Sequence, residues 1–174
     1  METLETKRLQ LREWELSDAN DLYSYAKTSK VGPMAGWKPH ESLEESKQII
    51  EMFQQEDETW AICLKENHKV IGSIGLHHTE NPKERMLGYV LGEDLWGRGI
   101  VPEASRAVMR YGFERLALDS ISVYHFPFNQ QSKRVIQKLG FQYITIKEKS
   151  FQRYDGVILD EVMYRIKKDE FQTE

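Results

Sequence analysis

Apolar and polar positions alternate in the segment 8–12, and a two-residue period is typical of β-strands with one buried face. Short, largely apolar segments bounded by polar or turn residues predict further strands at 59–64, 70–78, 86–91, 121–125, 141–147 and 157–166. Elsewhere apolar residues recur every three or four positions, which predicts amphipathic helices. In the segment 132–139, for example, Val135, Ile136 and Leu139 follow Ser132 at helical spacing.

Capping residues indicate where these helices begin and end. Ser17 can cap a first helix, and Ser42 with Glu45 has the spacing of a capping box ahead of a second. Gly140 stands where the last helix should end. The segment 29–40 is rich in glycine and proline, so we expect a loop there.

The order of elements is one strand, two helices, three strands, a helix, a strand, a helix and two strands. This order predicts an α/β (α+β) domain with a mixed sheet of about seven strands flanked by about four helices. A chain of 174 residues is long enough for one full core, so we expect a single domain over 1–174.

Composition narrows the function classes. The net charge of −4 argues against a duplex nucleic-acid binder, and the lone cysteine, Cys63, provides neither a disulfide framework nor a cysteine-based metal site. No apolar run approaches the roughly 20 residues that span a bilayer. The chain start shows no basic and apolar leader pattern. We therefore expect a cytoplasmic protein with no metal, membrane or nucleic-acid partner.

The sequence Trp96-Gly97-Arg98-Gly99 stands between a predicted strand and a predicted helix. A tight turn that leads directly into a helix leaves backbone N–H groups unpaired at the positive end of the helix dipole. Such a terminus binds phosphate groups, although a turn with two glycines is often only a turn.

Two motifs in order resemble one known family. Trp96-Gly97-Arg98-Gly99 is followed by Pro102-Glu103-Ala104, and Asn129-Gln130-Gln131-Ser132 is followed by Lys138-Leu139-Gly140-Phe141. Together they resemble the GCN5-related N-acetyltransferase superfamily, in its Rim-type branch of ribosomal-protein-alanine N-acetyltransferase-like enzymes. The resemblance implies a mostly antiparallel sheet with a splayed V between the strand at 86–91 and the strand at 121–125. Many members of that branch are dimers, so it also implies a homodimer.

The resemblance implies that acetyl-CoA is the co-substrate. Its pyrophosphate would lie on the backbone of Arg98, Gly99, Ile100 and Val101. Its pantetheine arm would lie between Val90-Leu91 and Asn129, with Ser132 near the thioester sulfur. We expect Arg134 and Lys138 to contact the phosphates of the coenzyme, although they can also be solvated surface residues. Trp96 and Val101 depart from the basic or polar and the small residues that are usual at their positions.

The catalytic residues are less clear from the resemblance. Many members carry a tyrosine seven residues after the asparagine, where this chain has Ile136, so the resemblance implies Ser132 as the group that protonates the leaving thiolate. Glu93, acting through water, is our candidate for the base. His77, His78, Tyr154 and Asp155 stay open for that role, and Gln152 stands where relatives have an acidic residue.

We expect Trp37, His77 and Tyr154 to bind the acceptor. The function expected is acetyl transfer by direct attack of a primary amine, in particular a protein or peptide N-terminal α-amine. A small amine such as a polyamine or an aminoglycoside is the alternative acceptor. A coenzyme-A-binding regulatory module without catalysis is the alternative class. His77 and His78 can also be a solvated pair, Trp37 can fill the core, and Cys63 is expected in the core rather than as a nucleophile.

Overall fold

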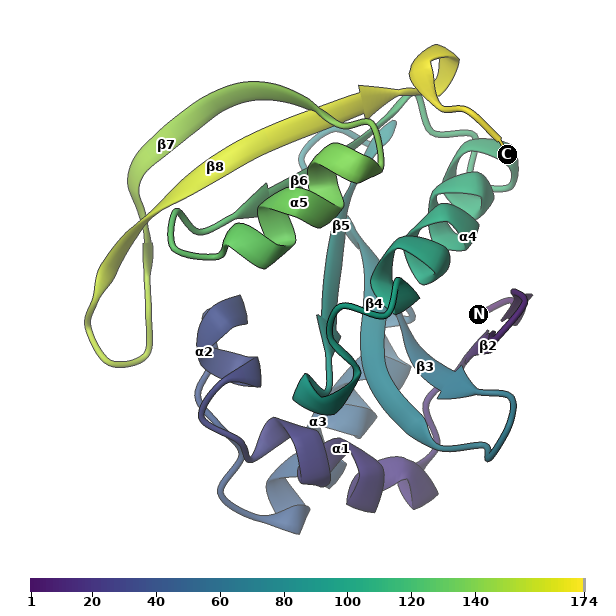
Figure 1. Ribbon diagram of the computed structural model, residues 1–174, viewed down its shortest axis with the longest axis vertical. Coiled ribbons are helices and arrows are strands. Elements are labelled where there is room, and N and C mark those ends of the chain that lie inside the picture. Colours follow the sequence, from purple (N-terminus) through teal and green to yellow (C-terminus); the bar gives the residue numbers. More distant parts are fainter. Residues whose placement is uncertain (174) are drawn as a thin grey trace.

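The computed structural model describes residues 1–173, and its strands form one eight-stranded sheet in the order β1-β2-β3-β4-β5-β6-β8-β7 (Figure 1). The strands are β1 (Leu4–Glu5), β2 (Leu9–Arg12), β3 (Thr59–Leu64), β4 (Val70–His78), β5 (Glu84–Leu91), β6 (Ser120–His125), β7 (Gln142–Gln152) and β8 (Ile158–Lys167). All neighbouring pairs are antiparallel except β5 and β6. The expected mixed, mostly antiparallel sheet is therefore confirmed.

The helices are α1 (Ala19–Ala26), α2 (Val31–Ala35), α3 (Leu43–Glu56), α4 (Ile100–Glu114) and α5 (Gln130–Lys138), with short 3-10 turns η1 (Leu16–Asp18), η2 (Glu93–Leu95) and η3 (Lys168–Glu170). In the view of Figure 1, α1, α2 and α3 gather at the lower end, while α4 and α5 lie above them. The hairpin of β7 and β8 arches away from the rest of the fold.

The two faces of the sheet carry two hydrophobic clusters. Alternate residues of β4 and β5, among them Ile74, Leu76 and Leu87, pack in one cluster with the buried side of α4 and with Ile136 of α5. The other cluster joins α1 and α3 to the opposite face of the sheet. Because side chains alternate along a strand, Ser73, Gly75 and His77 of β4 lie on the face that α1 and α3 cover.

The strands β5 and β6 are paired only at one end, through Glu84, Arg85 and Met86. The carboxylate of Glu84 holds this closed end, because it accepts hydrogen bonds from Ser120 Oγ at 2.6 Å and from Arg165 Nε at 2.7 Å. Beyond Met86 the two strands no longer pair, which confirms the expected V between 86–91 and 121–125.

Several expected boundaries are wrong. The two-residue β1 adds a strand to the seven expected, and Ser17 lies inside η1 rather than capping α1. A short helix, α2, lies within the expected loop 29–40. Its proline, Pro33, is compatible with a helix because it falls in the first turn, where a missing N–H costs no hydrogen bond. Ser42 does cap α3, since its Oγ accepts from the N–H of Glu45 at 3.1 Å.

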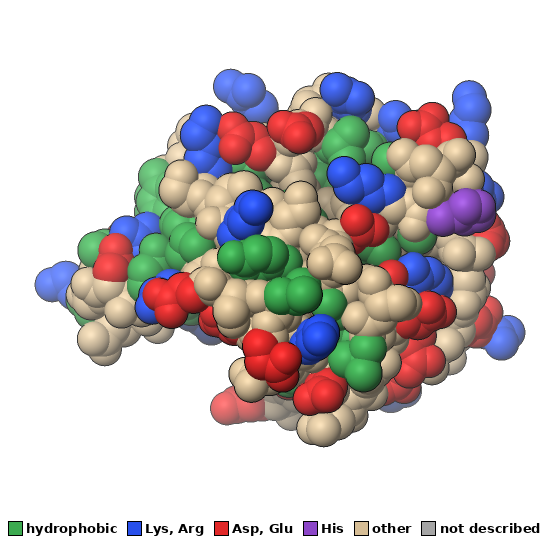
Figure 2. All heavy atoms as spheres, turned by 90° about the horizontal axis from the view of Figure 1, so that it is seen from below, with side chains coloured by type: hydrophobic (Ala, Val, Ile, Leu, Met, Phe, Trp, Pro, Cys, Tyr) green, Lys and Arg blue, Asp and Glu red, His purple; other side chains and the backbone are tan. Residues whose placement is uncertain are grey.

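Acidic and basic side chains are interspersed on the end of the molecule that α1 and α3 form (Figure 2). The first turn of α3 contains Glu44 and Glu45, and its last turn is followed by Asp57 at a left-handed φ of 53°. Because both signs of charge share this surface, we expect only weak electrostatic steering of a cationic acceptor toward it.

Candidate functional site

The V between β5 and β6 opens into one large cavity of about 1010 Å³. Its walls come from both faces of the sheet: α4 and α5 contribute on one side, and α1, α2 and α3 on the other. Pockets for small molecules usually measure about 300–1,000 Å³, so this cavity is large enough for two substrates side by side.

The N-terminus of α4 forms one end of the cavity. Gly99 precedes the helix at a φ of 73° and offers no side-chain cap, while Pro102 in the first turn has no N–H. The N–H groups of Ile100 and Val101 have no acceptor within the helix, because the carbonyls they would need precede it. Gly99, Ile100 and Val101 all line the cavity, so their backbone and the helix dipole suit a pyrophosphate.

The turn before α4 is held by the N-terminal segment. Arg8 donates from Nη1 to the carbonyl of Arg98 at 3.0 Å, and its Nε pairs with the carboxylate of Glu103 at 2.7 Å. Thr6 also donates to Glu103, at 2.6 Å. Burial alone would raise the pKa of Glu103, but the bonds from Thr6 and Arg8 lower it below its usual value. The turn is therefore fixed before any ligand binds.

Trp96 explains one departure from the family pattern. Its indole Nε1 donates to the carbonyl of Leu91 at 2.8 Å, and its ring packs against both hydrophobic clusters. Trp96 thus ties the end of β5 to the turn and also lines the cavity. The side chain of Arg98 is exposed, and Arg98 is not among the residues that line the cavity.

Helix α5 forms a second wall and begins at Asn129. The side-chain oxygen of Asn129 accepts from the N–H of Ser132 at 3.1 Å, and its amide nitrogen donates to the carbonyl of Met34 at 3.3 Å. Asn129 therefore caps α5 and joins it to α2. Arg134 and Lys138, one turn apart on α5, line the cavity and carry positive charge toward it.

Ser132 lies in the first turn of α5, where its Oγ makes a hydrogen bond of 2.7 Å with the hydroxyl of Tyr89. Both residues line the cavity. Burial raises the pKa of Tyr89 to about 12, so the phenol stays protonated at neutral pH. Ile136, at the position of the family tyrosine, is fully buried in the core and cannot take part.

The opposite wall belongs to the helices α2 and α3 and the segment between them. Trp37 lines the cavity and packs against the α1–α3 cluster, and its ring lies 5.3 Å from that of His40 at an interplanar angle of 45°. It therefore both fills the core and forms a wall. His40 is buried, and its Nδ1 lies 2.8 Å from the hydroxyl of Ser46. Burial lowers the pKa of His40, so it is neutral at neutral pH.

His77 lines the cavity from β4 and contacts a carboxylate. Its Nδ1 lies 3.1 Å from Glu58, whose other oxygen contacts the Nδ1 of His78. The side chain of His77 is 42% exposed and that of His78 65%, whereas Glu58 is only 15% exposed. Burial alone would raise the pKa of Glu58, but the bonds to His78 and His77 lower it. The two histidines are thus not a freely solvated pair.

Besides Arg98, two more of the expected site residues, Glu93 and Tyr154, lie outside the cavity lining. Glu93 is in η2 and pairs with Lys30 at 2.7 Å, with 38% of its side chain exposed. Tyr154 is at the tip of the β7–β8 hairpin, beside Arg153 and Asp155, and is 47% exposed. The hydrogen bond from Arg153 lowers the pKa of Asp155 to about 2, so this carboxylate is a poor proton acceptor at neutral pH. Gln152 is likewise exposed in β7.

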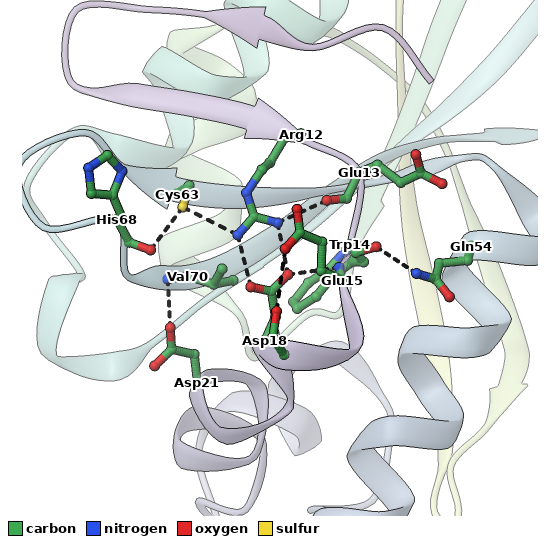
Figure 3. A network of polar contacts seen from close by, with 11 residues as sticks. Arg12, Glu13, Trp14, Glu15, Asp18, Asp21, Gln54, Cys63, His68 and Val70 are labelled. Carbon is green, nitrogen blue, oxygen red and sulfur yellow. Dashed lines mark hydrogen bonds and ion pairs between the residues drawn. The ribbon is translucent and has the colours of Figure 1, made fainter.

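Cys63 belongs to the core, as expected. Figure 3 shows it within a polar network in which Arg12 pairs with Asp18 at 2.8 Å. The thiol donates to the carbonyl of His68 at 3.2 Å, is 2% exposed and packs in the α1–α3 cluster. Burial raises its pKa, which opposes the thiolate that a nucleophile needs.

Tyr89 and Glu58 are two polar groups at the site that the sequence patterns did not single out. Tyr89 is in β5 and its partner Ser132 is in α5, while Glu58 precedes β3 and its partner His77 is in β4. No sequence motif with a fixed spacing predicts either pair, because each pair forms only when the right strands and helices become neighbours in the fold.

Comparison with known proteins agrees with this fold and cavity. The family model described as the acetyltransferase (GNAT) domain matches residues 8–142. A curated relative, the uncharacterized N-acetyltransferase p20 of Bacillus licheniformis, is 31% identical over 98% of this chain and 99% of its own.

Two solved structures show the same fold at low identity. The acetyltransferase (GNAT family) from Bacillus anthracis superposes with a TM-score of 0.90 at 22% identity, over 97% of this chain and 100% of its own. The ribosomal L7/L12 α-N-protein acetyltransferase RimL, in complex with coenzyme A, superposes with a TM-score of 0.80 at 19% identity. The match covers 95% of this chain and 98% of the RimL chain.

The fold and the cavity define an acyltransferase of the GNAT class. This chain belongs to the acetyltransferase (GNAT) domain family and is an N-acetyltransferase. Within residues 1–173 no helix combines the length and the apolar character needed to cross a membrane.

Proposed function

We propose that the protein transfers an acetyl group from acetyl-CoA to a primary amine, by direct attack within a ternary complex. The observation that carries this proposal is the cavity itself, which joins the N-terminus of α4 on one face of the sheet to the wall of α2 and α3 on the other. A donor and an acceptor can thus approach one another through the V between β5 and β6.

The donor would occupy the side of α4 and α5. The N–H groups of Ile100 and Val101 suit the pyrophosphate, and Arg134 and Lys138 add positive charge. The pantetheine arm would follow Val90 and Leu91 in β5, where the V leaves the strand unpaired beyond Met86. A strand with free backbone groups pairs readily with an amide-containing chain.

In the reaction, the amine nitrogen forms a bond to the thioester carbon and the carbon–sulfur bond breaks. Ser132 would donate its proton to the departing thiolate and recover one from Tyr89, 2.7 Å away. A proton released by the amine nitrogen would then return to Tyr89 through water, so that both hydroxyls are restored. A thiol has a pKa of about 8.5, so its thiolate needs only modest assistance to leave. A hydrogen bond from a positioned hydroxyl can provide this assistance.

We propose a protein or peptide N-terminal α-amine as the acceptor. Its pKa, about 7.7–8.0, lies well below the roughly 10.4 of lysine, so less proton removal is needed near neutral pH. Structural likeness to RimL, an α-N-protein acetyltransferase, supports this choice.

The test is release of free coenzyme A thiol from acetyl-CoA with four acceptor classes. They are peptides with free N-termini, lysine peptides with blocked N-termini, polyamines and aminoglycosides. We expect release with the free N-termini. Release only with polyamines or aminoglycosides would replace the peptide by a small amine. Thermal protection by acetyl-CoA without release in any arm would favour a non-catalytic coenzyme-A-binding module.

A further inference from the structure

Two glycines create a depression in the sheet beneath the imidazole of His77. Gly75 of β4 and Gly88 of β5 are direct cross-strand partners. A Cβ at Gly88 would lie 3.0 Å from Nε2 of His77, and no other residue's atoms come within 4 Å of it. A Cβ at Gly75 would also lie 3.0 Å from the same Nε2. The ring therefore lies over both glycines, in space that side chains would otherwise fill.

The contact with Glu58 determines which ring nitrogen is available. A carboxylate only accepts hydrogen bonds, so the proton of a neutral imidazole is on Nδ1, which faces Glu58 at 3.1 Å. Nε2 then carries the free electron pair, and it has no hydrogen-bond partner within residues 1–173. His125, which also lines the cavity, differs: its Nδ1 donates to the carbonyl of Phe126, and its Nε2 accepts from Tyr164.

Strand β5 determines where the imidazole ring of His77 lies relative to Ser132. Gly88 underlies the ring of His77, and its neighbour Tyr89 contacts Ser132. Consecutive residues of a strand point to opposite faces, with Cα atoms 3.8 Å apart. His77 and Ser132 therefore line the cavity from the two faces of the sheet, next to neighbouring residues of β5.

A buried hydroxyl beside His77 also lacks a partner. Thr59 pairs with Gly75 across the strands, is 5% exposed and lines the cavity, yet its Oγ1 has no hydrogen bond within the described residues. Buried polar groups are rarely left unpaired, so an unpaired hydroxyl on a cavity wall indicates a ligand group. This second observation supports a polar ligand on the wall that His77 and Thr59 share.

We propose that His77, held by Glu58, takes the proton from the acceptor amine, an inference that rests on the proposed function. Nε2 removes one proton from the ammonium group, and the freed electron pair of nitrogen attacks the thioester carbon. As the carbon–sulfur bond breaks, the thiolate gains a proton from Ser132, and the second proton of the nitrogen passes through water to restore the Ser132–Tyr89 hydroxyl pair. The products are the amide, the coenzyme A thiol and one proton, which His77 returns to water.

Other charged groups near the imidazole are few. His78 shares the carboxylate of Glu58, and Arg85 of β5 is the cross-strand partner of His78. Glu45 lines the cavity from α3. Glu58 is thus the only carboxylate within residues 1–173 that contacts the ring of His77.

The first experiment compares the pH dependence of kcat/KM for the wild type and for His77→Ala. We expect the variant to lose about 100-fold at pH 7, within the usual range for general base catalysis. The loss should shrink above pH 9, where an α-amine with a pKa near 8 is already neutral. Added imidazole should restore part of the rate. A purely structural role for His77 would lower the rate equally at all pH values and would not respond to imidazole.

His78→Ala is the matched control, because it removes the other imidazole on Glu58 and leaves the one that lines the cavity. We expect a decrease of less than about threefold, far below that of His77→Ala. Equal stabilisation of both variants by acetyl-CoA in a thermal melt would show that they fold and bind the donor.

A double-mutant cycle with Gly88→Ala tests the geometry. The new Cβ meets only the ring of His77, so we expect it to lower kcat about tenfold in the wild type. In the His77→Ala background the same change should have no effect. An equal effect in both backgrounds would mean direct obstruction of the acceptor and would contradict the proposal.

The thiol-release assay of the wild type separates this inference from the proposed function. If the wild type releases thiol and His77→Ala matches it at every pH, the role of His77 is wrong while the function stands. If the wild type releases no thiol with any acceptor, both proposals fail.

Discussion

The two sides of the cavity are built from different kinds of groups. On the side of α4, the groups that suit a ligand are backbone N–H donors at a helix end, and their positions follow from two residues at positive φ, Gly97 and Gly99. On the side of α2 and α3, the chemistry depends on side chains such as Trp37, His77 and Thr59, which come from separate segments. The groups on the side of α4 are therefore positioned by one turn, whereas the groups on the side of α2 and α3 are positioned by the whole fold.

This difference suits the roles proposed for the two sides. A donor that is always the same molecule can be bound by backbone groups, which no substitution removes. An acceptor that differs between relatives requires side chains, because these can change without altering the turn at 96–99. We therefore expect substitutions on the two sides to affect different kinetic constants.

The largest effect should come from the hydroxyl pair where the two sides meet. Ser132→Ala removes the group nearest to the proposed leaving thiolate, and we expect kcat to fall about 100-fold with little change in the affinity for acetyl-CoA. Tyr89→Phe should lower kcat less, since Ser132 remains. Steady-state kinetics with acetyl-CoA varied will check this. An unchanged kcat for Ser132→Ala would remove Ser132 from the mechanism.

Gly97→Ala should have the next largest effect. Gly97 has a φ of 76°, and no atom lies within 4 Å of a Cβ placed there, so the substitution adds backbone strain without a clash. A left-handed conformation costs a non-glycine residue about 1–2 kcal/mol. Relief of that strain would displace the N–H groups of the turn, so we expect acetyl-CoA to bind about tenfold more weakly in calorimetry.

Gly156→Ala is the control for that prediction. Gly156 has a φ of 85° and equally open surroundings, but it lies at the turn of the β7–β8 hairpin. The two variants should lose similar stability, and only Gly97→Ala should lose affinity. Equal affinities would show that the turn at 96–99 does not bind the donor.

The same difference between the sides decides how much could be predicted from the sequence. The donor side was predictable, because Gly97, Gly99, Asn129 and Ser132 lie in two compact motifs at element boundaries. The strands 59–64 and 70–78 were also predicted to the residue. Both faces of each strand are almost entirely buried, so each is a short, largely apolar run bounded by polar residues. The pairing of His77 with Glu58 requires the register that places Thr59 opposite Gly75, which the sequence alone does not determine.

Two further differences between the expected and the observed structure have physical causes. The strand β7 continues to Gln152, past the expected end at 147, because it is exposed along most of its length and carries no alternation of burial. A register shift between Lys147 and Phe151 interrupts its pairing as well. Glu93 follows β5 closely along the chain, and in the structure its carboxylate pairs with Lys30 and lies outside the cavity lining, so its role as the base stays a prediction.

Asn129→Ala should have a smaller effect that involves both sides. The side chain caps α5 through Ser132 and reaches the carbonyl of Met34 in α2, so its loss should lower stability by about 1 kcal/mol. For a chain of this size that corresponds to about 2–4 °C in Tm. We also expect weaker donor binding, with a smaller change in kcat than for Ser132→Ala. Thermal melts with and without acetyl-CoA will measure both effects.

The smallest effect should come from Glu103→Gln, which weakens the contact with Arg8 that holds the turn at 96–99. The pKa of Glu103 is lowered in the folded protein, so its contribution to stability is fully present above the unfolded value of about 4.3. That contribution is lost as the pH falls through the lowered pKa. Because the pair with Arg8 is partly exposed, we expect a destabilisation of about 1 kcal/mol or less at pH 7. The difference in Tm between wild type and variant should shrink below pH 4.

Glu5→Gln is the control that distinguishes the contact between Glu103 and Arg8 from surface ion pairs in general. Glu5 pairs with Lys65 at 2.8 Å on the exposed edge of the sheet and touches neither Arg8 nor the turn. Both variants remove a carboxylate whose pKa is lowered, so both should show the same sign of pH dependence. Only Glu103→Gln should weaken acetyl-CoA binding, by about two- to threefold, because only Glu103 holds the arginine that bonds the carbonyl of Arg98. Equal donor affinities in the two variants would mean that the turn keeps its geometry without this contact.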